Sequence, residues 1–129
     1  MIETPRKQTL RKHERLYEKT AIDLVFQKGK IIHNSPIKLL WVIDKRKSDE
    51  PVKVAFSVPK RLFKSAVTRN LLKRRMREAY RKNKILKAGQ DTTYAIMFIY
   101  SARKINLYAE IESKIVVTLQ HFKTTTGAE

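Results

Sequence analysis

The sequence contains no cysteine, only three glycines and 12 acidic residues. Without cysteine, neither a disulfide framework nor a thiolate zinc site can form. With so little glycine, phosphate-cradling loops and nucleophile elbows are nearly excluded. No stretch approaches the roughly 18 apolar residues of a membrane-spanning helix. Residues 1–19 are polar and lack the apolar core of a secretory signal. These absences favour a cytoplasmic protein with no membrane association.

Positive charge is what the chain has in excess. Its 129 residues carry 29 Lys or Arg, and the formal net charge is +17. This length suggests one domain with one hydrophobic core. A charge of this size says little about the fold, but it favours association with a polyanion. We therefore expect a nucleic acid as the main partner, with RNA first.

Hydrophobic periodicity predicts a single α+β domain. Helices are expected at residues 19–28, 65–89 and 106–123, and strands at residues 31–44, 52–58 and 92–100. Pro36 either splits its strand in two or marks a sheet edge. The polar loop after Asp44 is expected to join the first two strands as a hairpin. Ser65 and Asn106 are the predicted N-caps of the second and third helices, and Gly29 and Gly89 are predicted to follow the first and second.

The chain ends are predicted to lie outside this domain. Residues 1–18 are basic and poor in apolar side chains, which predicts a flexible arm. The folded domain then spans residues 19–123, and residues 124–129 form a disordered tail. The last helix is expected to bury one apolar stripe, formed by Leu107, Ile111, Ile115, Leu119 and Phe122.

Residues 60–84 contain eleven Lys or Arg and a single acid, Glu78. At about 100° per residue, cations and one amide gather on one helical face. That face holds Asn70, Lys73, Arg74, Arg77, Arg81 and Lys84. The opposite face is apolar, with Leu72, Met76, Ala79 and Leu86 at its centre and Leu71 and Tyr80 beside it. Like charges one turn apart repel, and no acid is interleaved on the basic face to relieve them. A phosphate backbone would remove this penalty and release counterions, although many charged helix faces are simply solvated.

The same segment resembles the motif of the bacterial ribonuclease P protein subunit. The matching residues are Arg69, Asn70, Lys73, Arg74, Arg77 and Glu78. Three further segments support the resemblance in the expected order, at residues 25–29, 56–61 and 119–122. Together they cover about residues 10–122.

This resemblance implies a function and a fold. The family's protein is an accessory subunit of an endoribonuclease whose RNA subunit is the catalyst. It binds that catalytic RNA and the 5′ leader of precursor tRNA, and the complex hydrolyses one phosphodiester to give the mature tRNA 5′ end. Mg²⁺ is required and is held mainly by the RNA. The implied fold is a compact two-layer α+β sandwich with about four strands in a mixed sheet and a left-handed strand-helix-strand crossover. Without RNA, the protein is expected to be a monomer.

The resemblance also implies two groups of RNA-binding residues. Contacts to the catalytic RNA fall on the basic helix, at Arg69, Asn70, Lys73, Arg74, Arg77 and Arg81. Contacts to the leader lie between the first helix and the sheet, at Ile22, Phe26, Trp41, Phe56, Ser57, Lys60 and Arg61. Aromatic side chains in a positive groove are a usual platform for single-stranded RNA, but Phe26, Trp41 and Phe56 are equally suited to a core.

Nothing in the sequence indicates a catalytic site on the protein itself. His13, His33 and His121 are too scattered for a metal site, and no pair of carboxylates is placed for acid–base catalysis. Composition alone leaves open a ribosomal or RNA-chaperone protein, which the ordered motif matches disfavour. A DNA-binding module is disfavoured because an Arg/Lys face suits phosphates rather than base edges. Binding to a membrane surface is disfavoured because the apolar face of the basic helix is expected to pack on a core.

Overall fold

The structure is a computed structural model that describes residues 15–16, 19–44, 52–84 and 93–126. Its elements are α1 (Lys19–Lys28), β1 (Lys30–Asn34), β2 (Ile37–Asp44), β3 (Val52–Ser57), α2 (Ala66–Asn83), β4 (Thr93–Tyr100) and α3 (Tyr108–Thr126). The predicted α+β class and element order are confirmed. Pro36 does split its segment, because β1 and β2 flank the Ser35-Pro36 turn and pair antiparallel.

The four strands form one mixed sheet in the order β1-β2-β4-β3. β4 pairs antiparallel with β2 and parallel with β3, so the predicted hairpin between the segments on either side of the 45–51 loop is wrong. The physical reason is the composition of β4, whose side chains are nearly all buried along its length. A strand that is apolar on both faces is most stable in the middle of a sheet. The β3-α2-β4 crossover places it there, and the left-handed sense of this crossover stays a prediction.

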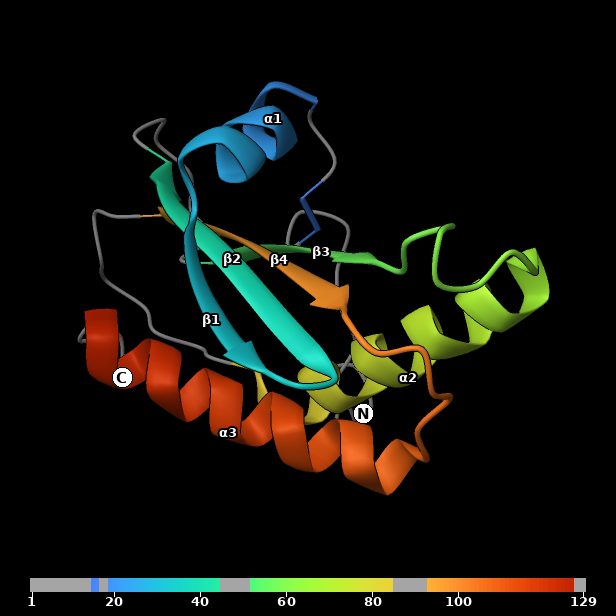
Figure 1. Cartoon of the computed structure of the whole chain (residues 1–129). Helices are drawn as coiled ribbons and strands as arrows, with labels where there is room; N and C mark the ends of the chain where they lie inside the picture. Colours follow the sequence, from blue (N-terminus) through green and yellow to red (C-terminus); the bar gives the residue numbers. More distant parts are fainter. Residues whose placement is uncertain (1–14, 17–18, 45–51, 85–92, 127–129) are drawn as a thin grey trace, which may run out of the picture.

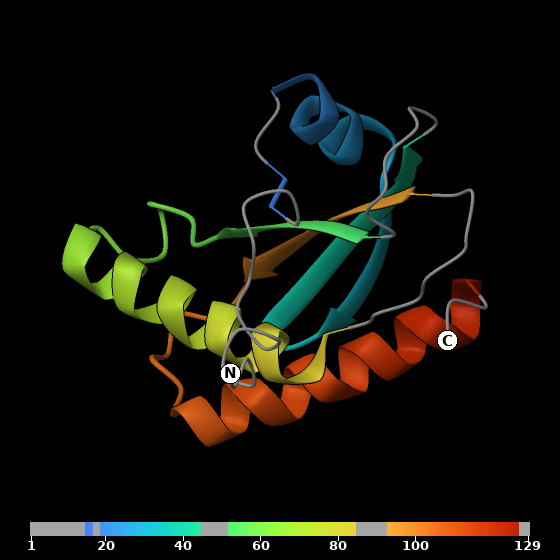
Figure 2. The same cartoon turned by 180° about the vertical axis from the view of Figure 1, so that it is seen from behind.

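Helices cover the two faces of the sheet unequally. α2 and α3 pack together on one face, and α1 lies across part of the other (Figures 1 and 2). We call these the α2/α3 face and the α1 face. The two-layer sandwich expected from the sequence corresponds to the sheet with α2 and α3, and α1 adds a short helix on the opposite side.

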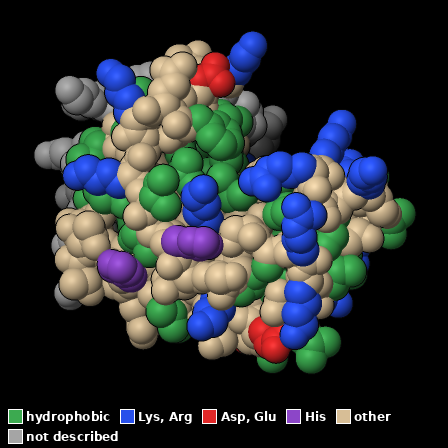
Figure 3. Space-filling model, in the orientation of Figure 1, with side chains coloured by type: hydrophobic (Ala, Val, Ile, Leu, Met, Phe, Trp, Pro, Cys, Tyr) green, Lys and Arg blue, Asp and Glu red, His purple; other side chains and the backbone are tan. Residues whose placement is uncertain are grey.

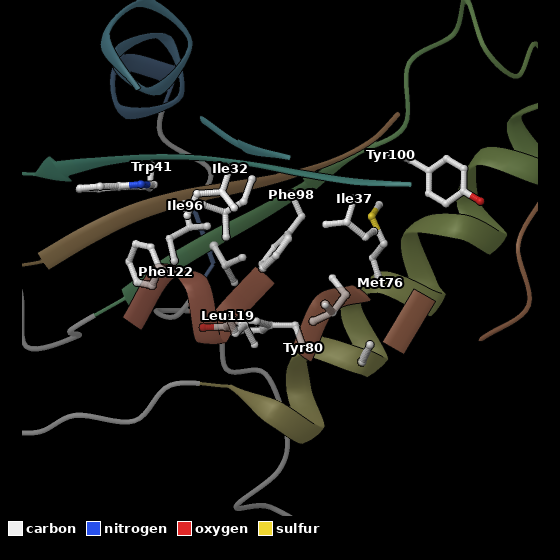
Figure 4. Packing of buried hydrophobic residues seen from close by; sticks show 14 of the residues in the cluster. Ile32, Ile37, Trp41, Met76, Tyr80, Ile96, Phe98, Tyr100, Leu119 and Phe122 are labelled. Atoms are coloured by element: carbon white, nitrogen blue, oxygen red, sulfur yellow. The ribbon is translucent and has the colours of Figure 1, made fainter. Parts of the chain in front are cut away.

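The larger core lies on the α2/α3 face and is rich in aromatic rings (Figure 4). The ring of Trp41 meets those of Tyr94 and Phe122 edge-on, at centroid distances of 6.0 and 5.5 Å. Such edge-to-face pairs add about 0.5–1.5 kcal/mol to the free energy of burial. A smaller core under α1 contains Leu16, Ala21, Val25, Leu40, Ala95 and Met97.

Local signals set most helix ends. Ser65 is the N-cap of α2, as predicted, because its side chain accepts a hydrogen bond from the Thr68 amide at 3.3 Å. α1 ends before Gly29, also as predicted, since a Cβ at this position would lie 2.2 Å from the carbonyl oxygen of Val25. By contrast, α2 ends at Asn83, so the end expected at Gly89 is wrong, and Gly89 lies outside the described residues.

The start of α3 differs from the prediction in detail. The Asn106 side chain does not cap the helix: its oxygen accepts a hydrogen bond from the Tyr100 hydroxyl at 2.5 Å. The Glu110 carboxylate instead accepts from the Leu107 amide at 3.1 Å, which satisfies a backbone N–H at the helix start. Leu107 itself is 67% exposed, whereas the other predicted stripe residues are buried.

The predicted chain ends fall largely outside the described residues. Within the predicted arm, Leu16 is buried and its amide donates to the Val54 carbonyl at 2.7 Å. At the other end, α3 continues through Thr126, so the prediction of a disordered tail is wrong for residues 124–126. The physical reason is hydrogen bonding in the last turn, where the Thr126 hydroxyl donates to the Phe122 carbonyl at 2.8 Å.

Candidate nucleic-acid interface

α2 separates apolar and basic side chains as its sequence predicts. Leu72, Met76, Ala79 and Tyr80 are buried against the sheet and α3. Asn70, Arg74 and Arg77 are exposed on the other side, and Lys73 is half-buried. The helix therefore presents cations and an amide outward from a rigid, well-packed base.

Arg69 and Arg75, near this face, donate hydrogen bonds to backbone carbonyls of the protein. Arg69 donates to the carbonyls of Phe63 and Lys64 at 2.9 and 2.8 Å, which fixes the loop before α2. Arg75 donates to the Asn106 carbonyl at 2.5 Å, which ties α2 to the segment before α3.

Arg81 pairs with Glu78 one turn earlier, so the prediction of a face without interleaved acids is wrong at this position. The two residues are three positions apart, so helical spacing alone could have predicted this pair. The hydrogen bond from Arg81 lowers the pKa of the Glu78 carboxyl. Arg81 is thus partly neutralised before any RNA arrives.

Lys73, Arg74 and Asn70 keep their polar side-chain groups available to a ligand. Within the described residues, Lys73 and Arg74 have no hydrogen bond or ion pair, and neither has the side chain of Asn70. Arg77 is exposed, and its guanidinium lies 5.9 Å from the centre of the Phe56 ring in a cation–π contact. Lys60, Arg61 and Lys64 are exposed in the loop that leads into α2 and extend the positive surface.

The residues predicted to bind the leader do not share one face of the sheet. Successive residues of a strand point to opposite faces, so Phe56 and Ser57 cannot line the same surface. Phe56 lies on the α2/α3 face, where its ring stacks on Phe98 at 5.7 Å. Trp41 lies on that face too and is only 6% exposed. The prediction that Trp41 and Phe56 line a surface beside α1 is therefore wrong.

The α1 face retains Ile22, Phe26 and Ser57 from the predicted set. Phe26 is 54% exposed, and Ile22 packs against the smaller core. Strand register places Ser57 beside Ile99 of β4, Lys38 of β2 next, and His33 of β1 at the edge. We call His33, Lys38, Ile99 and Ser57 the polar row; His33 is exposed and the other three are half-buried. α1 lies toward the other end of the sheet (Figure 1).

Sequence reasoning missed His33 and Lys38. The ring Nε2 of His33 lies 2.9 Å from the Ser101 hydroxyl oxygen, so a second hydroxyl joins the row at its edge. In the view of Figure 3, apolar side chains below α1 are interspersed with Lys, Arg and His. Strand alternation would have placed Lys38 opposite Leu39 and Trp41, and only the sheet order brings it next to Ser57.

The described residues contain no group of three or more His, Cys, Asp or Glu that could hold a metal ion. None of the helices in the described ranges is long and apolar enough to cross a membrane. The chemistry available on this surface is the binding of phosphates and of unpaired bases.

Comparison with known proteins agrees with this surface. The family model described as Ribonuclease P matches residues 10–123, which is most of the chain. The chain belongs to the ribonuclease P protein family.

Two curated relatives illustrate the similarity. The ribonuclease P protein component of Chlorobium phaeobacteroides is 42% identical over 79 residues, which is 59% of this chain and 54% of the relative. That of Porphyromonas gingivalis is 39% identical over 77 residues, or 60% of this chain and 56% of the relative. The matched region thus spans about half the length of these relatives.

Solved structures share the fold. The ribonuclease P protein of Staphylococcus aureus superposes with a TM-score of 0.68 at 23% identity, covering 85% of this chain and 95% of that one. The protein of Thermotoga maritima gives a TM-score of 0.64 at 24% identity, covering 83% and 96%. At such identities the likeness concerns the arrangement of helices and strands.

Proposed function

We propose that this protein is the protein subunit of a ribonuclease P holoenzyme, an endoribonuclease that removes the 5′ leader of precursor tRNA. The observation that carries the proposal is the outward face of α2, where Asn70, Lys73, Arg74 and Arg77 project from a packed helix. Catalysis is assigned to the RNA subunit, in keeping with the accessory role of the protein in this family. Mg²⁺ is held mainly by that RNA in this proposal.

The α2 face binds the catalytic RNA. Arg74 and Arg77 supply planar guanidinium groups that can donate two hydrogen bonds to one phosphate, and Lys73 adds a point charge. Arg69 and Arg81 belong to the predicted set as well, and both already donate hydrogen bonds to groups of the protein. We expect these two to contribute less than Arg74, because part of their donor capacity is already used.

The α1 face binds the leader as a single strand. Phe26 offers an exposed ring on α1, and Lys38 lies in the middle of the polar row, with Ser57 beyond Ile99. Lys60 and Arg61 lie after β3, where they extend the charge from the polar row toward α2. A strand with phosphates on these cations and a base on Phe26 would be held without reading a particular sequence.

In this proposal the protein increases the affinity of the holoenzyme for precursor over mature tRNA. The two RNA contacts lie on opposite sides of the sheet, so the catalytic RNA and the leader can be bound at once. The protein acts in the cytoplasm and is a monomer until it meets the RNA.

The test is cleavage of a precursor tRNA at low Mg²⁺ by a bacterial ribonuclease P RNA, with and without this protein, and by the protein alone. Cleavage only when both are present is the expected result. Tight RNA binding without any stimulation would instead favour a ribosomal or chaperone role. Cleavage by the protein alone would place an active site on the protein and contradict the proposal.

A further inference from the structure

A groove lies between the turn that joins β1 to β2 and the first half of α3 (Figure 1). Its volume is about 390 Å³, which falls within the roughly 300–1,000 Å³ typical of small-molecule sites. Both elements line it: Ser35 and Pro36 from the turn, and Ala109, Glu110, Ser113 and Lys114 from one face of α3. None of these residues belongs to the polar row or to the outward face of α2. Neither RNA contact of the proposed function therefore uses this groove.

The two walls of the groove are fixed to each other. Asn34, at the end of β1, donates its side-chain amide to the hydroxyl of Thr118, a buried residue of α3, at 3.2 Å. The Pro36 carbonyl accepts from the Ser101 amide at 2.8 Å, which holds the turn to the segment after β4. A ligand would therefore meet a preformed site and would not have to order it on binding.

The Glu110 carboxylate is held in place on the α3 wall. Its Oε1 accepts from the Leu107 amide and from the Asn106 side-chain amide, each at 3.1 Å. These two hydrogen bonds lower the pKa of Glu110, so the group is ionised at neutral pH. A carboxylate can accept about four hydrogen bonds, and Oε2 has none within the described residues. Glu110 can therefore accept two more N–H donors from a ligand.

The other polar side chains of the groove are also open to a ligand. In the described parts of the chain, the Lys114 ammonium and the hydroxyls of Ser35 and Ser113 make no hydrogen bond or ion pair. Glu110 and Lys114 are one helical turn apart, a spacing that favours an ion pair, yet the structure does not pair them. The groove thus presents an acceptor and a donor side by side on α3.

This combination fits a guanine base. On its Watson–Crick edge guanine carries two adjacent N–H donors, at N1 and N2, next to the O6 acceptor, whereas each of the other three bases offers only one donor group there. The Pro36 ring and the Ala109 methyl supply apolar surface for the faces of the base. A phosphate is disfavoured by the Glu110 carboxylate. A free amino acid would depend on two exposed ion pairs, which contribute little.

We propose that this groove binds a guanine base, which donates N1–H and N2–H to Glu110 and accepts from Lys114 at O6. The hydroxyls of Ser35 and Ser113 line the same groove and can bind the ribose. The base belongs either to a free guanosine nucleotide or to an unpaired position of an RNA strand. The groove is a third binding site, in addition to the two RNA contacts of the proposed function.

The experiment is residue-resolved NMR of the protein alone, because a chain with a net charge of +17 attracts many polyanions without specificity. Amide chemical shifts are followed during titration with guanosine monophosphate and, separately, with adenosine monophosphate, which carries the same phosphate. Saturable shifts are expected at Ala109, Glu110 and Ser113. The affinity for guanosine monophosphate should be about tenfold higher, as is usual for one bidentate pair. Equal affinities, or shifts confined to α2 and the polar row, would overturn the proposal.

A substitution that fills the groove provides the second test. Ser113 is exposed, so Ser113→Phe should fold and should lose guanosine monophosphate binding because the ring occupies the groove. Val117→Phe is the matched control and should bind as wild type. Val117 lies one turn further along α3, is 44% exposed and does not line the groove. Binding retained by a folded Ser113→Phe variant would contradict the assignment.

Oligouridylates with and without one central guanosine identify the source of the base. If the oligoribonucleotide with guanosine binds at the groove amides more tightly than the monophosphate does, the groove takes an RNA strand. If it binds there more weakly, the groove takes a free nucleotide. If neither ligand shifts the groove amides, the groove assignment fails. That failure would leave the proposed function intact, because stimulation of precursor tRNA cleavage is measured separately.

Discussion

Arg74 and Arg75 are neighbours on α2, yet they have different surroundings. Arg74 is exposed and has no hydrogen bond or ion pair within the described residues. Arg75 is half-buried and donates to the Asn106 carbonyl, which lies 31 residues further along the chain. In the proposed function, the same kind of side chain therefore binds RNA at one position and links secondary-structure elements at the next. The density of charge in a motif does not equal the number of its RNA contacts.

The link at Arg75 is part of a wider network. The Tyr100 hydroxyl oxygen lies 2.5 Å from the Asn106 side-chain oxygen and 2.6 Å from the Lys104 carbonyl oxygen, so the two acceptors share its single proton, and it accepts from the Asn106 amide at 2.9 Å. Burial raises the pKa of this tyrosine, which keeps its hydroxyl protonated and able to donate. Arg75 closes the network from α2, so the end of β4, the start of α3 and α2 are fixed relative to one another. The outward basic face of α2 is thus held on a rigid frame.

The largest effect is expected when two outward arginines are removed together. Arg74→Ala combined with Arg77→Ala should lower the log–log salt slope of RNA binding by about two units, one for each lost phosphate contact. Stability should change by less than about 0.5 kcal/mol, because both side chains are exposed. Filter binding to a ribonuclease P RNA at several salt concentrations measures the slope. If the double variant showed the same salt slope as wild type, these two arginines would not contact the RNA.

Removing the hydrogen bond between Arg75 and the Asn106 carbonyl should lower the stability of the fold. Arg75→Ala leaves the Asn106 carbonyl without its charged donor, which should destabilise the protein by about 1–2 kcal/mol. Thermal or denaturant unfolding of this variant, next to Arg74→Ala as the matched control, gives the difference. Equal stabilities of the two variants would contradict the structural role assigned to Arg75.

A smaller effect is expected on the other face of the sheet. Lys38→Ala should reduce the preference of the holoenzyme for precursor over mature tRNA roughly fivefold, the value of about one phosphate contact. Binding of the catalytic RNA should not change, since Lys38 lies on the α1 face. Lys114→Ala, on the exposed side of α3, serves as the control. Loss of affinity for the catalytic RNA in Lys38→Ala would show that the two faces do not act separately.

The smallest effect concerns pH. The hydrogen bond from the Leu107 amide lowers the pKa of Glu110 below the ordinary value of 4.5. A carboxyl whose pKa is lower in the folded state stabilises the fold above its unfolded pKa, and this contribution is lost as pH falls through the folded pKa. The melting temperature of wild type should therefore fall below about pH 4.5 by more than that of Glu110→Gln. If the melting temperatures of wild type and Glu110→Gln depended on pH in the same way, the Glu110 carboxylate would not stabilise the start of α3.

Short-range signals in the sequence predicted the elements well. Ser65 caps α2 through an amide three residues away, and Gly29 ends α1 because its missing Cβ would meet Val25. The helical period placed Leu72 and Met76 inside and Arg74 outside. These properties depend on neighbours within about one helical turn, so the sequence contains them directly.

Long-range pairing was not accessible in the same way. The position of β4 between β2 and β3 depends on a comparison of all strands, and it decides that Lys38 and Ser57 share the polar row. The opposite directions of Phe56 and Ser57, by contrast, follow from strand alternation alone and could have been predicted. The contact between Arg75 and the Asn106 carbonyl could not have been predicted, because no residue near Asn106 in the sequence indicates that Arg75 would reach it.

The most direct test of the account compares the salt dependence of ribonuclease P RNA binding by Arg74→Ala and Arg75→Ala. The account predicts that Arg74→Ala lowers the slope by about one unit and that Arg75→Ala, studied at a temperature where it is folded, retains the wild-type slope. The reverse pattern, or equal losses in both variants, would contradict the division of α2 into RNA-binding and fold-linking arginines.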